Sequence, residues 1–189
     1  TETNVPHEEN VSYFGQGDEA HMVYQFSLPP LLLHAIHSAQ TRYLYDWLKN
    51  LSMPPTGCTY FNFTASHDGI GVRPLEGLLP EHEIKQLLED MRARGAYVST
   101  RRNAMGEDVP YEINVTFYDS FRSPGQRSAP WQVARYMLSQ TVALSLRGIP
   151  GIYIHSLLAT PNDHTRVEVT GATRSINRHQ WDMDEISAL

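Results

Sequence analysis

The alternation of strand-like and helix-like segments along the chain most constrains its fold. Runs rich in apolar and aromatic residues at 22–28, 58–63 and 149–158 have the composition of buried strands. Between them, apolar residues recur at helical spacing in the segments 31–48, 80–94 and 130–146. Such alternation is typical of parallel strands joined by helices. The sequence therefore predicts an α/β fold.

Local signals refine these boundaries. Pro29-Pro30 are expected to end the first strand and open the first helix, because proline cannot donate to a ladder. Gly95 is the predicted stop of the second helix. The third helix is expected to bury one apolar stripe. The residues of that stripe are Val133, Met137, Leu138, Thr141 and Leu144.

The remaining segments are predicted to be less regular. Segments 96–101 and 109–115 flank a glycine-containing loop and are expected to pair as an inserted hairpin. Residues 159–179 are polar and are predicted to form a long loop, and a further helix is expected to begin within 181–189. The polar segment 1–10 is predicted to be turn-like, and its abrupt start suggests a cut in a longer protein.

Composition excludes several classes of partner and location. With 41% apolar and 19% charged residues, the chain reads as globular. Its net charge of -6 argues against nucleic-acid binding, and no apolar run reaches the length of about 18 residues that suggests a membrane span. Cys58 has no second cysteine to pair with, and no Cys/His cluster has metal-ligand spacing. The sequence predicts a cytoplasmic protein without a metal site and without nucleic-acid or membrane partners.

Candidate functional residues follow the predicted strands, where the working residues of α/β barrels lie. They form three groups: the start around Glu2, the pair His67-Asp68, and a loop that holds Asn162, Asp163 and 174–179. Taken singly, each has an ordinary alternative as a solvated charge, a turn or a surface ion pair. Two carboxylates at neighbouring strand ends with Arg and His donors nearby are what glycosidic-bond chemistry needs.

Four segments carry a resemblance to a known family. FNFTASHDGIGVRPLEGLL resembles the region around the seventh strand, and TETNVPH the fifth-strand end, of the sucrose phosphorylase group in the α-amylase clan, glycoside hydrolase family thirteen. YEINVTFYDS resembles the acceptor-side loop of that group. GIPGIYIHSLLATPND with RSINRH resembles its eighth strand and the following loop. The resemblance runs in the expected order along essentially all 189 residues.

This resemblance implies a fold and an activity. Residues 1–189 would be the carboxy-terminal half of a (β/α)8 TIM-barrel catalytic domain, from the end of the fifth strand through the eighth. The complete enzyme would be a retaining glycoside phosphorylase that moves a glucosyl group between an α-glucoside and inorganic phosphate. No cofactor would be needed, since the carboxylates and phosphate make and break every bond. The sequence leaves the oligomeric state open.

The resemblance also assigns roles to residues. Glu2 matches the general acid/base, and Asp68 the carboxylate that stabilises the transition state. The residues that match substrate-binding positions are His67 beside Asp68, Arg174 in the glucosyl subsite, Tyr111 and Glu112 in the acceptor-side loop, Asn162 and Asp163 in the second mobile loop, and His7 toward phosphate or the acceptor.

One departure from the family pattern is decisive. The family's nucleophile is an Asp in a Gly-x-Arg-x-Asp context, and this sequence has no such segment. Asp18 and Asp46 lie in the wrong surroundings to replace it. Because the first step is attack by that carboxylate, the chain by itself is predicted to be inactive.

The donor is open among related sugars. Three features are more similar to the glucosylglycerate phosphorylase branch than to sucrose phosphorylases, namely the forms ETNVPH and FNFTASHDGIGVRPLEG and the residue Glu112. Glucosylglycerate is therefore favoured as the donor over sucrose, with sucrose 6-phosphate behind both. An anionic glycerate would need cations, for which Arg101, Arg102 and Arg166 are candidates. The alternatives to a phosphorylase are an α-glucoside hydrolase of the same clan and a non-catalytic carbohydrate-binding module. The module would usually show an all-β pattern, which is not found.

Overall fold

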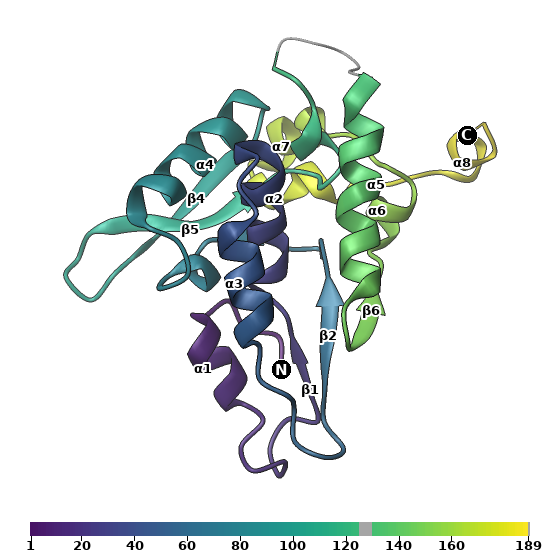
Figure 1. The fold of residues 1–189 in the computed structure, drawn as a ribbon. Helices are drawn as coiled ribbons and strands as arrows, with labels where there is room; N and C mark the ends of the chain where they lie inside the picture. Colours follow the sequence, from purple (N-terminus) through teal and green to yellow (C-terminus); the bar gives the residue numbers. More distant parts are fainter. Residues whose placement is uncertain (125–129, 189) are drawn as a thin grey trace.

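A parallel sheet forms one layer of the computed structural model, which describes residues 1–124 and 130–188, the side chain of Pro130 excepted. Its strands are β1 (Met22–Tyr24), β2 (Thr59–Phe63) and β6 (Ile149–Gly151), in the order β1-β2-β6. Val23 lies opposite Tyr60, and Phe61 opposite Ile149. Helices lie beside this sheet (Figure 1). The predicted α/β class with parallel strands is therefore confirmed.

The first two helices differ from the prediction. The expected helix 31–48 is divided into α2 (Leu28–Ser38) and α3 (Arg42–Asn50), because Ala39 adopts a left-handed conformation with φ 56° and ends α2. Pro29 and Pro30 lie in the first turn of α2, where a missing N–H costs no hydrogen bond. The predicted strand 22–28 is consequently wrong after Tyr24, since the helix begins before the prolines.

The inserted hairpin is confirmed. After α4 (Glu81–Ala93) and the predicted stop at Gly95, which has φ 89°, the chain forms β4 (Tyr97–Arg102) and β5 (Asp108–Asn114). These strands pair antiparallel. A short strand that the sequence did not predict, β3 (Ile70–Gly71), pairs with the other edge of β5, so the second sheet has the order β3-β5-β4.

The last third of the chain is more helical than predicted. The strand expected at 149–158 ends at Gly151, and α6 (Ile154–Leu157) follows. The long loop expected at 159–179 contains α7 (His164–Thr170) and the 3-10 helix η3 (Thr173–Asn177). Asp163 caps α7 by accepting the backbone N–H of Arg166, which explains why a helix begins in this polar segment.

Other short elements complete the fold. The predicted helix in 181–189 is confirmed as α8 (Met183–Ser187), while Leu189 lies outside the described residues. The turn-like start is wrong, because it contains α1 (His7–Ser12). Two 3-10 helices are η1 (Arg73–Leu75) and η2 (Asp119–Phe121). In the described part of the chain, no helix combines the length and apolar character that crossing a membrane requires.

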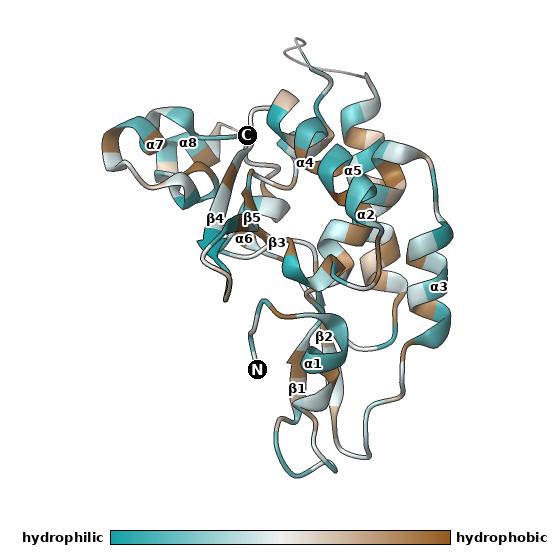
Figure 2. Ribbon diagram, turned by 90° about the vertical axis from the view of Figure 1, so that its left-hand side faces the viewer, coloured by the Kyte–Doolittle hydropathy of each residue, from teal (hydrophilic) through white to brown (hydrophobic). Residues whose placement is uncertain are grey.

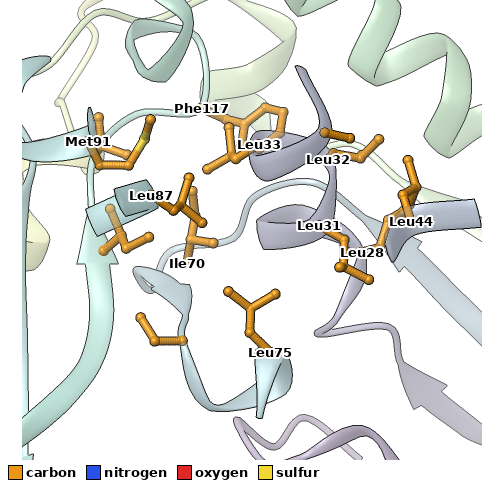
Figure 3. Packing of buried hydrophobic residues seen from close by; sticks show 14 of the residues in the cluster. Leu28, Leu31, Leu32, Leu33, Leu44, Ile70, Leu75, Leu87, Met91 and Phe117 are labelled. Atoms are coloured by element: carbon orange, nitrogen blue, oxygen red, sulfur yellow. The ribbon is translucent and has the colours of Figure 1, made fainter. Parts of the chain in front are cut away.

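The main hydrophobic core lies between α2, α4 and the hairpin sheet. Four leucines of α2 are buried there (Figure 3). They meet side chains from β3, η1, α4 and the segment after β5, namely Ile70, Leu75, Leu87, Met91 and Phe117. Burying a Leu or Phe side chain contributes about 1.5–3 kcal/mol, so this contact between the helices and the inserted sheet holds the hairpin in place.

The apolar stripe predicted for α5 (Pro130–Ser145) does not face the core. Val133, Met137, Leu138 and Leu144 are 52–55% exposed. The buried side of α5 carries Tyr136, Ser139 and Ala143, along with Gln132, whose amide donates to Asp119 of η2 over 3.2 Å. The side of α5 that packs inward thus combines the core residues Tyr136 and Ala143 with a polar contact to η2.

Candidate active site

The segment that carries Glu2 is held at both ends. The amino group of Thr1 donates to Met22 O (2.7 Å), and Tyr24 N–H donates to Thr1 O (3.2 Å), which ties the start of the chain to β1. Figure 2 shows the N-terminal segment beside β1 and α1. On the other side, Asn4 Nδ2 donates to Tyr111 O (3.3 Å) and lies against Gly71, where a Cβ would not fit. Glu2 is thus fixed between the two sheets with its side chain exposed.

His67 and Asp68 follow the end of β2. His67 Nε2 is 3.7 Å from Asp68 Oδ1. The nearest ligand atoms of Glu2, His67 and Asp68 all lie within 4.8 Å of one another. The structure therefore brings two of the predicted groups of candidate residues together, the segment beside β1 that holds Glu2 and the loop after β2.

The 3-10 helix η3 supplies cations to the same place. Arg174 Nη1 is 2.8 Å from Asp68 Oδ1, and Arg178 Nη2 is 3.3 Å from the same oxygen. Arg178 Nε also donates to His67 O (2.7 Å), and Asn177 Nδ2 donates to Asp68 O (2.9 Å). Charge-assisted bonds of this kind are stronger than neutral ones and hold the His67-Asp68 loop in one orientation.

A second carboxylate completes the network. Glu112 Oε2 and Oε1 accept from Arg174 Nε (2.9 Å) and Nη2 (2.6 Å), a bidentate pair. The hydrogen bond to Glu112 raises the pKa of Arg174, and the negative charges of Glu112 and Asp68 raise it further against the effect of burial. Arg174 is thereby positively charged and shared by two carboxylates.

A cavity of about 260 Å³ opens beside these groups. Glu2 and His67 line it together with Tyr153, and its walls include the aromatic side chains Tyr24, Phe61 and Phe63. Burial raises the pKa of the Tyr153 hydroxyl, with Arg178 opposing and Asp68 reinforcing the shift. A cavity with apolar walls and a few charged groups is typical of a small-molecule site.

The cluster of Glu2, His67 and Asp68 is close enough to hold a cation by distance alone. However, Asp68 Oδ1 is already approached by two guanidinium groups, Arg174 and Arg178. Their positive charge disfavours a metal ion on that oxygen. The arrangement fits hydroxyl groups of a ligand better than it fits a metal.

His7 lies apart from this cavity. It belongs to α1, and its Nδ1 accepts from Trp47 Nε1 (3.2 Å). Burial lowers the pKa of His7, and Glu8 opposes this shift. His7 lines a different cavity of about 560 Å³ together with Trp47 and Glu76. The structure therefore does not bring His7 to the Glu2 cluster.

Asn162 and Asp163 are also separate from the Glu2 cluster. Asn162 N–H donates to Asp119 Oδ2 (2.8 Å), and Asn162 Oδ1 accepts Thr116 N–H (2.8 Å). Asp163 pairs with His179 Nδ1 (2.8 Å). Burial acts to raise the pKa of Asp163, but the hydrogen bonds from His179 and Arg166 outweigh it and lower the pKa. Both residues line a third cavity of about 410 Å³ and have structural partners.

Two residues of the site had no predicted role. Asn177 and Arg178 belong to the candidate group 174–179 but were given no function, although with Arg174 they have the i, i+3, i+4 spacing that places side chains on one face of a helical turn. Because residues 159–179 were predicted to form a loop, this helical spacing was not considered. Tyr111 and Glu112, which the resemblance placed in an acceptor-side loop, lie in strand β5, within the segment 109–115 that was predicted to be a strand. Nothing in the sequence indicated that Glu112 would pair with Arg174.

No family model matches the sequence. The chain is 50% identical over 188 residues to glucosylglycerate phosphorylase of Escherichia coli strain K12, covering 99% of this chain and 34% of that protein. It is 47% identical over 180 residues to glucosylglycerate phosphorylase of Spirochaeta thermophila, covering 95% of this chain and 30% of that protein. It is 31% identical over 185 residues to sucrose phosphorylase of Streptococcus mutans, covering 96% of this chain and 35% of that protein.

A solved structure agrees with these relatives. The crystal structure of sucrose 6F-phosphate phosphorylase from Thermoanaerobacter thermosaccharolyticum matches with a TM-score of 0.82 and 27% identity, covering 98% of this chain and 36% of that one. The chain spans about a third of the length of the curated relatives it matches. The predicted resemblance to the sucrose phosphorylase group is confirmed.

Proposed function

We propose that this chain, a homologue of the glycoside phosphorylases of the sucrose phosphorylase group, forms the acid/base half of a retaining glycoside phosphorylase. The observation that carries the proposal is the meeting of Glu2, His67 and Asp68 within 4.8 Å of one another. The reaction moves a glucosyl group between an α-glucoside and inorganic phosphate, and gives α-glucose 1-phosphate.

The proposed roles are those that the family resemblance implies, and the proximity of the groups supports them. A carboxylate from a segment outside this chain attacks the anomeric carbon, and the bond to the leaving oxygen breaks as Glu2 donates it a proton. A phosphate oxygen then attacks the same carbon, the glucosyl ester bond breaks, and Glu2 takes back a proton. Asp68, with His67, binds sugar hydroxyls and stabilises the positive charge that develops on the ring.

We propose the barrel on the basis of the sheet. The order β1-β2-β6 would correspond to three consecutive strands of a (β/α)8 barrel, and the hairpin β4-β5 to an excursion from it. The match to the solved sucrose 6F-phosphate phosphorylase supports this assignment. Residues 1–189 would then belong to one catalytic domain together with segments outside this chain.

Glucosylglycerate is the proposed donor. The glucosylglycerate phosphorylases are 43–50% identical to this chain, whereas the sucrose phosphorylases are 30–32% identical. The three arginines considered for glycerate do not line the cavity beside Glu2. Arg102 lies 3.8 Å from Asp108, and Arg166 donates to Gln180 (3.0 Å). The proposal therefore assigns them no role. A cytoplasmic location stays a prediction.

The test is phosphate-dependent release of glucose 1-phosphate by the full-length protein, with glucosylglycerate and sucrose as donors. Glu2→Gln is expected to lower kcat by about 10²–10⁴-fold, because the leaving oxygen loses its proton donor. Glu9→Gln, an exposed glutamate on α1, is the matched control and should keep normal turnover. Undiminished turnover of Glu2→Gln would contradict the acid/base role, and faster phosphorolysis of sucrose would contradict the proposed donor.

A further inference from the structure

Glu112 is a buried carboxylate one side chain away from the proposed reaction centre. We propose that it is a positioning residue that fixes Arg174 against Asp68 and so sets the glucosyl side of the site. This inference rests on the proposed function. It differs from the acceptor-side role that the resemblance implies for Glu112.

The geometry gives Arg174 one orientation. Glu112 accepts from Nε and Nη2, which are adjacent donors on one edge of the guanidinium group. Because the group is planar, a bidentate pair on this edge also fixes the direction of Nη1. Nη1 is the atom that lies 2.8 Å from Asp68 Oδ1. The contact between Arg174 and Asp68 thus depends on the hydrogen bonds between Arg174 and Glu112.

Burial separates the roles of the three residues. The side chain of Glu112 is 4% exposed, whereas those of Arg174 and Asp68 are 40% and 26% exposed. Glu112 lies in β5, between β3 and β4, where it is paired with Gly71 and Ser99. A carboxylate so enclosed cannot reach a ligand, so its effect on substrate passes through Arg174.

Glu112 offsets one of the two guanidinium charges that approach Asp68. Asp68 and Glu112 supply two negative charges, and Arg174 and Arg178 supply two positive charges. If Glu112 is made neutral, Arg174 loses its charged anchor while Arg178 still holds Asp68. We expect Arg174 to turn away from the orientation in which it supports Asp68.

Positioning and acceptor contact predict different kinetics. If Glu112 positions Arg174, Glu112→Gln lowers kcat by the same factor for every acceptor, of the order of 100-fold, because a small displacement of a catalytic group is enough for such a loss. The KM for each acceptor stays unchanged. If Glu112 contacts the acceptor, the substitution changes acceptor KM and the ranking of acceptors, and kcat follows the acceptor used.

The experiment measures glucosyl transfer from glucose 1-phosphate to glycerate, glycerol and fructose by the full-length protein. The variants are Glu112→Gln, Arg174→Lys and the double variant, with Glu107→Gln, an exposed glutamate before β5, as the matched control. The two single losses are expected to be non-additive, so that the double variant is no worse than Arg174→Lys alone. Additive losses, or a changed acceptor ranking, would overturn the inference.

Two further results keep the test decisive. If Glu112→Gln does not fold, Glu112→Asp takes its place, because it keeps the charge but retracts the carboxylate by one methylene. This variant is expected to lower kcat by the same factor for every acceptor. A wild-type kcat in Glu112→Asp would overturn the inference. A wild-type protein with no transfer to any acceptor would instead contradict the proposed function itself.

Discussion

The surroundings of His37 keep this half-buried histidine neutral. Burial lowers its pKa to about 3, and the positive charges of Arg94 and Arg135 act in the same direction, while a backbone hydrogen bond at Ser120 opposes them. The ring stacks on Phe121 at 5.5 Å. A histidine held neutral by its environment joins α2 to η2 without adding a charge to the core.

Acid should therefore weaken the fold at His37. Its pKa is lower in the folded chain than the unfolded value of 6.5, so only the unfolded chain gains a proton as the pH falls below 6.5. Stability is present above that pH and is lost progressively toward pH 3, the folded value. Unfolding of His37→Gln by urea at several pH values should show a weaker pH dependence than wild type. The exposed His82→Gln is the control, and an unchanged slope in His37→Gln would contradict this account.

At the scale of elements, α2 ends at a residue that fits poorly there. Ala39 has φ 56° and ψ 26°, a left-handed conformation that glycine adopts without a steric cost. Because the residue at this break is alanine and not glycine, the sequence carries no stop signal there, and the apolar spacing predicted one helix over 31–48. The break at Ala39 lets α3 diverge from α2.

Ala39→Gly is expected to stabilise the protein by about 1 kcal/mol, since glycine removes the left-handed penalty at a helix end. The measurement is the urea midpoint of unfolding. Ala35→Gly, a buried position inside α2, is the matched control and should lose about 1 kcal/mol or more through lower helix propensity. A lower midpoint for Ala39→Gly would show that the end of α2 is not strained.

At the scale of the whole molecule, a large apolar surface is exposed on α5, β6 and α6. Met137, Leu138, Ile152, Ile154 and Leu157 are each more than half exposed. Ile149 of β6 is 46% exposed, and β6 is an edge strand in this sheet. Exposed apolar patches and open edges promote association between chains.

The chain by itself is therefore expected to self-associate. Sedimentation velocity of the 189-residue chain over a range of concentrations should show species larger than a monomer. Leu138→Gln combined with Leu157→Gln should reduce association, because both side chains leave the apolar surface, while Glu168→Gln on α7 should not. A monomer that unfolds cooperatively at all concentrations would contradict the expectation.

The sequence by itself determined the α/β class, helices α4 and α5, strand β2 and the hairpin. These depend on local periodicity, caps and glycines, which can be read within a short window. Glu2 and the pair His67-Asp68 were separate candidates in the sequence, and only the folded chain brings them within 4.8 Å. The resemblance added the roles of the residues, which no spacing in the chain specifies.

Tertiary structure alone decided the face of α5, the end of β6 and the pairing of Glu112 with Arg174. α5 buries Tyr136 and Ala143 in the core and bonds Asp119 of η2 through Gln132, so the predicted apolar stripe faces outward. Residues 112 and 174 are 62 positions apart and belong to a strand and a 3-10 helix, so only packing brings them within hydrogen-bond distance. Long-range contacts between polar side chains leave no periodic signal in a sequence, and for this reason the network around Asp68 could be recognised only in the folded chain.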